Sequence, residues 1–293
     1  MEIAVISGKG GTGKSSVSAA FATMQPNVVL ADCDVDAANL YILFNPTHEK
    51  EEVFVSVYKA VIDKDRCTNC GLCIDYCRFD AIHDVEGEVL IDETACDGCK
   101  LCSRVCPSEA ISMIPEDKSR MYSGTFRNGK MVYGRLSPGE ENSGRLVDMV
   151  REEAKNVAKA NDLDTIIIDG PPGIGCSVIS TITGVDKVVI VTEPTLSGLH
   201  DLKRTIEVVS KFRLTKTVII NKYDLNTEMA NTIENYCKSQ DVPVIAKLPF
   251  DKVVVDAMVN CKSVIEYAPD SEIAGLLHEA YQKLSANKEF IYK

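Results

Sequence analysis

A glycine-rich loop near the start of the chain has the composition of a phosphate-binding site. Residues 8–15 match the pattern G-x-x-x-x-G-K-[ST] and read Gly8, Lys9, Gly10, Gly11, Thr12, Gly13, Lys14 and Ser15. Glycines allow backbone N–H groups to turn inward around a phosphate at the positive end of a following helix. Lys14 would neutralise β- and γ-phosphate oxygens, and the Ser15 hydroxyl would bind magnesium. The motif therefore predicts a site for ATP or ADP with Mg²⁺, which also includes Ser16.

The loop is flanked by the elements that this chemistry needs. Residues 1–6 form an apolar run typical of a buried parallel strand, and residues 16–22, rich in small side chains, indicate a helix. The alternative is an ordinary glycine turn before a helix. The full motif, with a strand before it and a helix after it, favours phosphate binding.

Two further strands are followed by acidic residues. A strand over 27–31 leads into Asp32 and Asp34, and a strand over 165–168 ends at Asp169. Ligands gather at the carboxyl ends of parallel strands, where a carboxylate can position water for in-line attack. Asp169 has the position of a Walker B aspartate, which holds magnesium through a water. The alternative for Asp34 is an acidic cap on a strand.

Eight of the twelve cysteines form two matching runs. The runs are Cys67, Cys70, Cys73 and Cys77, followed by Cys96, Cys99, Cys102 and Cys106, so the second repeats the first with an offset of 29 residues. Thiolates at i, i+3 and i+6 can converge on three corners of a cubane. Zinc sites usually use two C-x-x-C pairs, so runs of three cysteines favour iron–sulfur chemistry over zinc or disulfides.

The cysteine region resembles a bacterial-type two-cluster ferredoxin. The resemblance implies two [4Fe–4S] clusters, each held by three cysteines of one run and the fourth cysteine of the other. The first cluster would take Cys67, Cys70, Cys73 and Cys106, and the second would take Cys77, Cys96, Cys99 and Cys102. Arg78 stands where the pattern has a proline, as at Pro107, which alters a turn and adds a charge but removes no ligand.

Lys9 adds a second cation that the general phosphate-loop motif does not require. The form K-G-G-x-G-K-[ST] resembles the deviant-Walker family of MinD, ParA, Mrp and the nitrogenase iron protein. The resemblance implies that Lys9 reaches across a homodimer to the partner's nucleotide. It also implies that Lys9, Lys14 and Asp34 are catalytic, with Asp34 orienting the attacking water. The alternative for Lys9 is a solvated lysine at the loop edge.

The same resemblance implies further roles. Asp32 would lie near magnesium with Ser15 and Asp169, and Asn221, at the end of a strand over 217–220, would contact the adenine edge. The glycine- and proline-rich residues 170–175 would form a second switch that responds to the γ-phosphate. Cys176 follows this switch and is expected to be a small buried residue, although a cysteine near this point holds a shared cluster in the nitrogenase iron protein.

Length and charge limit the possible functions. The chain has 293 residues and a net charge of −11, which argues against a nucleic-acid surface and against binding to anionic membranes. No apolar run approaches the ~20 residues of a membrane-spanning helix. We therefore expect a cytoplasmic protein without a stable membrane anchor, whose many cysteines bind metal.

These observations predict an α/β protein. Its doubly wound, mostly parallel P-loop sheet would be interrupted by a small α+β ferredoxin-like domain. The predicted boundaries are 1–59 and 117–293 for the ATPase domain and 60–116 for the insert. A strand is expected over 53–57, a hairpin turning at Asn128–Gly129, and a helix over 144–160.

The predicted function is an ATP-dependent homodimeric switch, a slow ATPase that couples nucleotide state to electron transfer with a redox or metallocluster partner. Two alternatives remain open: assembly or delivery of iron–sulfur clusters, and a positioning ATPase of MinD or ParA type. Outside the cysteine runs, the ATPase part lacks the C-x-x-C of Mrp-type proteins, which counts against a simple cluster scaffold. The acidic net charge counts against a positioning ATPase.

Overall fold

The computed structural model describes residues 1–55, 58–137, 140 and 143–286. The chain divides into two compact units. Unit 1 comprises Met1–Glu52, Met121–Arg135 and Ser143–Lys293, and unit 2 comprises Val53–Arg120 and Leu136–Asn142. Each unit has its own core and is described separately.

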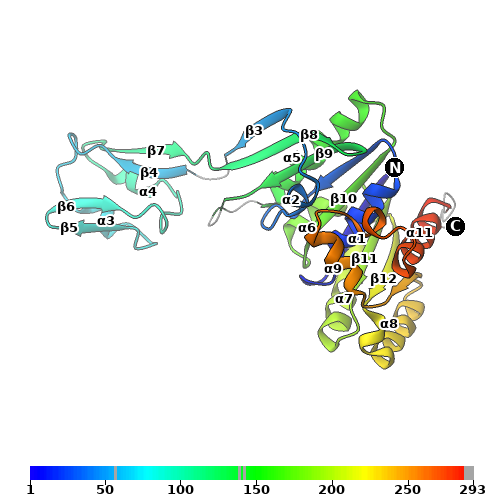
Figure 1. Cartoon of the computed structure of the whole chain (residues 1–293). Helices are drawn as coiled ribbons and strands as arrows, with labels where there is room; N and C mark the ends of the chain where they lie inside the picture. Colours follow the sequence, from blue (N-terminus) through cyan, green and yellow to red (C-terminus); the bar gives the residue numbers. More distant parts are fainter. Residues whose placement is uncertain (56–57, 138–139, 141–142, 287–293) are drawn as a thin grey trace. The chain divides into compact units, whose positions relative to one another are not determined.

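Unit 1 is built on a nine-stranded sheet with the order β13-β12-β11-β1-β10-β2-β9-β8-β3 (Figure 1). Its strands are β1 (Glu2–Ser7), β2 (Val28–Asp32), β3 (Lys50–Phe54), β8 (Ser119–Phe126), β9 (Gly129–Arg135), β10 (Thr165–Pro172), β11 (Lys187–Thr192), β12 (Thr215–Asn221) and β13 (Val244–Leu248). The seven strands from β13 to β9 are paired in parallel. Connections between parallel strands cross over one face, so the sheet is covered by helices.

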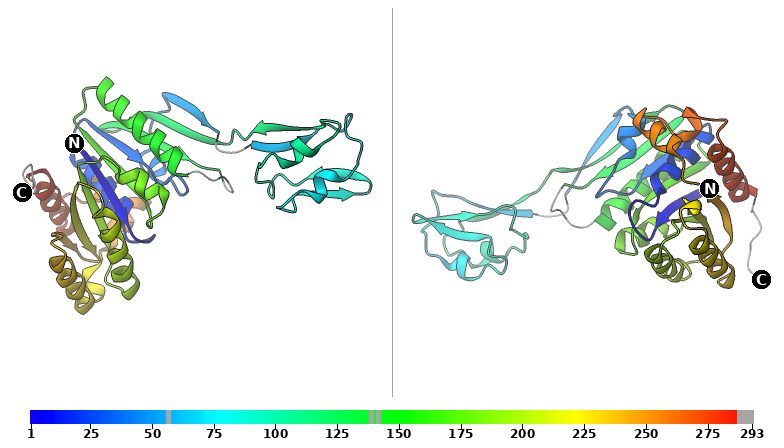
Figure 2. Two further views of the ribbon diagram at one scale, coloured as in Figure 1. Left: turned by 180° about the vertical axis from the view of Figure 1, so that it is seen from behind. Right: turned by 60° about the horizontal axis from the view of Figure 1, so that its bottom comes forward.

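The helices of unit 1 lie on both faces of this sheet. They are α1 (Lys14–Met24), α2 (Leu40–Phe44), α5 (Ser143–Ala160), α6 (Cys176–Ile182), α7 (Leu196–Val209), η1 (Tyr223–Leu225), α8 (Thr227–Ser239), α9 (Lys252–Val259), α10 (Val264–Tyr267) and α11 (Glu272–Ala286). Helix α1 packs with α10 and α11 against β1 and β10, while α5 packs with α6 against β9 and β2. Figure 2 shows α5, in green, along the face seen from behind.

The central strands are apolar because both of their faces are buried. Ile3 and Val5 contribute to the core beneath α1 and α11, and the alternate residues Ala4 and Ile6 are equally buried on the other face. The predicted strands before Asp32 and at 165–168 are confirmed as β2 and β10. The predicted hairpin is also confirmed, as β8 and β9, and the helix predicted over 144–160 is α5.

One predicted strand is misplaced. The alternating pattern predicted a strand over 53–57, but β3 covers Lys50–Phe54, and residues 56–57 lie outside the described part of the chain. Sheet pairing explains the shift, because β3 is the last strand of the order and lies beside β8. The charged residues Lys50 and Glu52 interrupt the apolar pattern that the sequence argument relied on, although they are acceptable on a sheet edge.

Unit 2 is small and contains two antiparallel pairs, β4 (Tyr58–Ile62) with β7 (Ile111–Pro115) and β5 (Ile82–Val85) with β6 (Glu88–Ile91). Its helices α3 (Leu72–Asp75) and α4 (Leu101–Val105) lie within the cysteine runs, and each contains the third cysteine of its run. The two sequence repeats exchange equivalent hydrogen bonds: the N–H of Asp63 donates to Ala110 O at 2.7 Å, and that of Asp92 donates to Ala81 O at 2.8 Å. The repeat is therefore also a structural one.

The core of unit 2 depends on its cysteines. Its buried cluster consists of Ala60, Cys73, Ile82, Val89, Cys102 and Ile111. Four more of the repeated cysteines pack against this cluster, namely Cys67, Cys77, Cys96 and Cys106. A core of this size buries little apolar surface on its own.

Candidate nucleotide site and cysteine cavities

The glycine-rich loop connects β1 to α1 with a backbone that few other residues could adopt. Gly11 and Gly13 have positive φ values of 80° and 91°. A Cβ on Gly13 would lie 2.3 Å from Asn221 Nδ2, and one on Gly8 would lie 2.6 Å from Asp201 Cβ. These glycines are therefore required by close packing as well as by backbone conformation.

Lys14 lies at the centre of a buried network of charges. Its Nζ is 2.9 Å from Asp169 Oδ2 and 3.4 Å from Asp34 Oδ2, and the lysine is only 6% exposed. The Ser15 hydroxyl donates to Asp169 Oδ2 at 2.7 Å, and the Ser18 hydroxyl donates to Asp169 Oδ1 at 2.6 Å. The structure thus brings together Lys14, Ser15, Asp34 and Asp169, which come from three separate parts of the sequence. It also places Ser18 in the same network.

Burial and neighbouring charges shift the pKa values of this network. Burial opposes the charged form of Lys14, but the carboxylates of Asp169 and Asp34 outweigh it and raise the pKa of Lys14. Burial raises the pKa of Asp34, against the opposing effect of Lys14. The acids around Lys14 therefore hold it in its charged form.

Asp32 connects the end of β2 to the start of α2. Its side chain accepts hydrogen bonds from the N–H groups of Asp34 (3.2 Å), Asn39 (3.2 Å) and Leu40 (3.1 Å). Burial, with Asp169 as the second cause, raises the pKa of Asp32 from 3.8 to about 7. The carboxyl group therefore caps the turn between β2 and α2, where burial and the nearby Asp169 oppose its ionisation.

Lys9 lies beside residues of its own chain. Its Nζ is 2.6 Å from Glu193 Oε1 and donates to Ser197 Oγ at 3.0 Å. Lys222 also approaches Glu193, at 3.4 Å, and donates to Gly11 O at 3.1 Å. Burial opposes ionisation of Glu193, but the two lysines outweigh it and lower the pKa of this carboxyl. Glu193 therefore pairs with Lys9 of the phosphate loop and with Lys222 beside it.

Asn221 lies beside the loop and opens onto a large cavity. Its Nδ2 donates to Thr12 O at 2.8 Å. The adjoining cavity of about 250 Å³ is lined by Gly11, Gly13, Ser16, Val17, Asn221, Lys222, Leu248, Pro249, Phe250, Asp251, Val254, Val255, Met258, Val264, Ile273 and Leu277. Mostly apolar walls with a few polar groups are typical of a cavity for a planar base.

The arrangement fits a nucleotide with magnesium. The buried Thr12 hydroxyl has no hydrogen-bond partner among the described residues, so a polar group of a ligand could satisfy it. Ser15, Asp32 and Asp169 provide oxygen atoms, which are the ligands that magnesium prefers. Lys14 provides the charge that a β- or γ-phosphate needs.

Sequence reasoning missed Ser18, Glu193 and Lys222 as members of the site. Ser18 lies one helical turn after Lys14, so its position on the same face of α1 could have been inferred. Glu193 directly follows β11, and the carboxyl ends of parallel strands are where such residues gather. Lys222 follows Asn221 with a left-handed backbone, a conformation that no sequence motif indicated.

The residues predicted to form a second switch, 170–175, lie only partly in a loop, because β10 continues to Pro172 and the turn before α6 covers residues 173–175. Gly173 has a positive φ of 97°, and Cys176 is the first residue of α6. The expectation that Cys176 is buried is wrong, because its side chain is exposed. The glycine-rich turn places the start of α6 at the surface.

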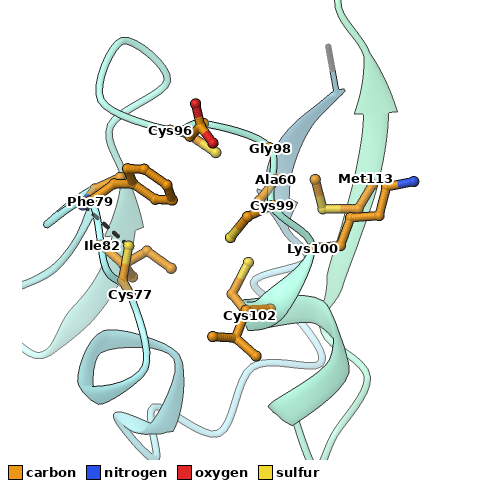
Figure 3. A pocket seen from close by; sticks show the side chains of 13 residues that line it. Ala60, Cys77, Phe79, Ile82, Cys96, Gly98, Cys99, Lys100, Cys102 and Met113 are labelled. Atoms are coloured by element: carbon orange, nitrogen blue, oxygen red, sulfur yellow. Dashed lines mark hydrogen bonds between the residues drawn. The ribbon is translucent and has the colours of Figure 1, made fainter.

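The eight repeated cysteines of unit 2 lie around two separate cavities. The Cys77 cavity, about 330 Å³ including space open to solvent, is lined by Cys77, Cys96, Cys99 and Cys102 together with Phe79, Lys100 and Met113 (Figure 3). The Cys67 cavity, about 300 Å³ when space open to solvent is included, is lined by Cys67, Cys70, Cys73 and Cys106 together with Thr68, Val89 and Ser108. Each cavity thus contains three cysteines of one run and the fourth of the other.

All twelve cysteines are free thiols. Backbone N–H groups point at three sulfur atoms: that of Asn69 at Cys67, that of Ala81 at Cys77 and that of Ala110 at Cys106, at 3.3–3.5 Å. Within the described ranges, no three His, Cys, Asp or Glu side chains converge closely enough to hold a single metal ion. Figure 3 shows the sulfur atoms spaced around the Cys77 cavity.

The thiols differ in their environment. Burial raises the pKa of Cys73 and of Cys102. Burial also acts on Cys106, but hydrogen bonds led by that of the Ser108 side chain outweigh it and lower the pKa of this thiol. Of these three thiols, Cys106 is the one whose surrounding hydrogen bonds favour the thiolate form.

Comparison with known proteins places the chain among nucleotide-binding proteins. Residues 3–264 match the family model described as the CobQ/CobB/MinD/ParA nucleotide binding domain. An uncharacterised protein of Methanocaldococcus jannaschii is 36% identical over 300 residues, covering 99% of this chain and 98% of its own length. The iron–sulfur cluster carrier protein of Pyrococcus abyssi is 24% identical, over 97% of this chain and 85% of its own.

A solved structure shows the same fold. The septum site-determining protein MinD of Pyrococcus horikoshii, complexed with Mg-ADP, has a TM-score of 0.57 and 21% identity, covering 97% of this chain and 95% of its own. Every helix in the described ranges is too short or too polar to cross a membrane. The match over most of its length establishes that the chain belongs to the CobQ/CobB/MinD/ParA nucleotide-binding domain family.

Proposed function

We propose that the protein is an ATP-hydrolysing, dimeric switch carrying two [4Fe–4S] clusters. Its nucleotide state would control electron transfer to or from a redox or metallocluster partner. The observation that carries the proposal is the sorting of eight free cysteines into two sets of four around two cavities, on a chain whose other unit has a glycine-rich loop with Lys14 paired to Asp169.

The cavities fit cubane clusters better than single ions. A cubane offers four iron atoms at separate corners, each of which takes one thiolate. Its ligands must therefore surround a volume and need not converge on one point. The lining of each cavity by four cysteines agrees with this requirement. When bound, the clusters would supply one-electron chemistry.

In the nucleotide site, the chain's own groups would divide the work of hydrolysis. Lys14 would pass from Asp34 and Asp169 to the phosphate oxygens, which frees Asp34 to accept a hydrogen bond from the attacking water. Ser15 and Asp169 would hold magnesium, with Asp32 nearby. Asn221 and the apolar cavity beside it would hold the base.

Dimer formation would depend on Lys9. In the single chain, Glu193 and Ser197 hold the Lys9 ammonium. The exposed fraction of this side chain is 28%, so it can exchange that contact for a phosphate of a partner's nucleotide. The resulting closure would be the signal that the cluster-bearing unit reads.

A second candidate function is the assembly or delivery of iron–sulfur clusters. It is favoured by relatives named as iron–sulfur cluster carriers, which are 24–25% identical over most of this chain. Eight complete ligands in two cavities favour firmly held clusters over labile cargo. A positioning role of MinD type has less support, because it gives the cysteine unit no task.

The proposal is tested with protein purified without oxygen. Iron and sulfide are counted, ATP turnover is measured, and the sedimentation coefficient is compared with and without a non-hydrolysable ATP analogue. We expect about eight irons per chain, slow turnover and dimers only with the analogue. Lys9→Ala should stay monomeric while retaining its clusters, whereas Lys203→Ala, which removes an exposed lysine on α7, should dimerise. A chain without iron, or dimers of Lys9→Ala, would contradict the proposal.

A further inference from the structure

The internal repeat allows the two cysteine cavities to be compared position by position. Adding 29 to a residue number in the first repeat gives its counterpart in the second. Asn69 at the Cys67 cavity corresponds to Gly98 at the Cys77 cavity. Ser108 at the Cys67 cavity corresponds to Phe79 at the Cys77 cavity. The backbone frames are equivalent, so differences between the cavities arise from such replacements.

The Cys67 cavity surrounds its sulfurs with polar groups. The N–H of Asn69 points at Cys67 Sγ at 3.5 Å, and the Asn69 amide oxygen lies 3.4 Å from the same sulfur. The Ser108 hydroxyl lies 3.5 Å from Cys106 Sγ, which also accepts from the N–H of Ala110 at 3.3 Å. A thiolate can only accept, so toward a bound thiolate the hydroxyl would donate and the amide would turn its NH₂ group inward.

The Cys77 cavity lacks both side-chain donors. Gly98 has no side chain, and a Cβ there would lie 2.1 Å from Tyr58 O, so packing of β4 requires the glycine. Phe79 presents an aromatic ring toward the cavity (Figure 3). Backbone groups still donate at this cavity: the N–H of Ala81 lies 3.4 Å from Cys77 Sγ, and that of Ser103 donates to Cys102.

At the Cys77 cavity, Asp97 stands where the Cys67 cavity has Thr68, and Arg78 stands where it has Pro107, so one negative and one positive charge are added together. Lys59 donates to Cys96 O at one cavity and is paired with Glu116. Arg66 donates to Ser108 O at the other and is paired with Glu109. Lys100 turns its ammonium away from the cysteines and lies over the Tyr58 ring (Figure 3). The hydrogen bonds to sulfur therefore remain as the main difference.

Hydrogen bonds to the sulfur ligands stabilise the more negative, reduced form of a cluster and raise its reduction potential. We propose that the cluster held at the Cys67 cavity has the higher potential, and that Asn69 and Ser108 set this difference. A single electron given by a low-potential donor comes to rest on the Cys67 side. In that step the cluster at the Cys77 cavity is oxidised and the other is reduced by one electron, with no bond made or broken. The inference rests on the proposed function, because it requires both clusters.

The test is a redox titration of the oxygen-free protein with dithionite, followed by electron paramagnetic resonance, after iron has been counted. The wild type should show two separate reduction steps. Asn69→Gly and Ser108→Ala each remove a donor and should lower only the higher step, while Ser108→Thr, which keeps the hydroxyl, should leave both in place. The reciprocal change Phe79→Ser, which introduces a hydroxyl at the Cys77 cavity, should raise only the lower step.

The outcomes separate the inference from the proposed function. About eight irons with a single unresolved step, or a shift of the lower step in Ser108→Ala, would overturn the inference and leave the proposed function standing. A chain that holds no iron would overturn both. If Asn69→Gly or Ser108→Ala loses iron, the titration of Phe79→Ser serves as the test. A lower reduction step that does not move in Phe79→Ser would overturn the inference.

Discussion

The nucleotide site of unit 1 and the cysteine cavities of unit 2 are maintained in different ways. In the first, the functional side chains bond to one another: Lys14, Ser15 and Ser18 all contact Asp169. In the second, the cysteines line two cavities without bonding to one another, and two of them, Cys73 and Cys102, also form part of the small core. A site whose groups satisfy each other can fold before its ligand arrives, whereas a site made of unbridged thiols depends on what it binds.

The largest expected effect follows from removing the clusters. Treatment with a chelator and oxidant should unfold unit 2, because four metal bonds in each cavity would supply much of its stability. Unit 1 should keep its fold and its affinity for nucleotide. Limited proteolysis and nucleotide binding measured on the same sample check this, with Cys176→Ala as a control that should not change iron content. If unit 2 stayed resistant to protease after losing its iron, its fold would not depend on the clusters, and the proposed difference from unit 1 would be wrong.

Lys14→Ala should affect unit 1 alone. It leaves Asp169, which is fully buried, without its cation, and breaking such a pair costs about 3–5 kcal/mol. Nucleotide binding should be abolished while the iron content is unchanged. Lys14→Ala combined with Asp169→Asn should recover much of the free energy of unfolding but no binding. ATP hydrolysis by Lys14→Ala would disprove the phosphate-site assignment.

The stability of unit 1 should depend on pH because ionising the buried Asp32 near Asp169 is unfavourable. The pKa of Asp32 is raised from 3.8 to about 7, so the folded state binds a proton more tightly than the unfolded chain. The free energy of unfolding should therefore fall as pH rises from about 4 to 7, with a slope of at most about 1.4 kcal/mol per pH unit. Asp32→Asn should flatten the profile in thermal melts, and Mg²⁺ with ADP should do the same for the wild type. A stability that increases across this range would contradict the assigned burial of the carboxylate.

A smaller effect distinguishes glycines that are required by packing from one that is not. A Cβ at position 8 would lie 2.6 Å from Asp201 Cβ, whereas one at position 10 meets nothing within 4 Å. Gly8→Ala should destabilise the nucleotide-free protein by about 1–3 kcal/mol, and Gly10→Ala should leave its denaturation midpoint unchanged. Equal midpoints for the two variants would show that the loop is looser than described.

Much of this arrangement could be predicted from the sequence because its signals are local. Buried parallel strands appear as short apolar runs, the phosphate loop is contiguous, and the resemblance of the cysteine repeat to a two-cluster ferredoxin implies which thiols share a cavity. The strand at Lys50–Phe54 was missed because its edge position tolerates charge. The exposure of Cys176 depends on a turn whose path the composition does not determine.

The contacts of Lys9 could not be predicted because they depend on which strands lie side by side. The motif indicates that a lysine follows Gly8, but Glu193 is 184 residues away and reaches it only because β11 lies next to β1. Such pairings are decided by strand order. Strand order is not encoded in any single segment, so the residues that restrain a motif were the least predictable part of the site.

The most direct test of the account is whether ATP alters the clusters. The reduction potentials of both clusters are measured by redox titration of wild type and Lys14→Ala, each with and without a non-hydrolysable ATP analogue. Coupling between the two units predicts that the analogue shifts at least one potential in the wild type and neither in Lys14→Ala. Wild-type potentials that are identical with and without the analogue, on protein shown to bind it, would contradict an ATP-controlled redox switch.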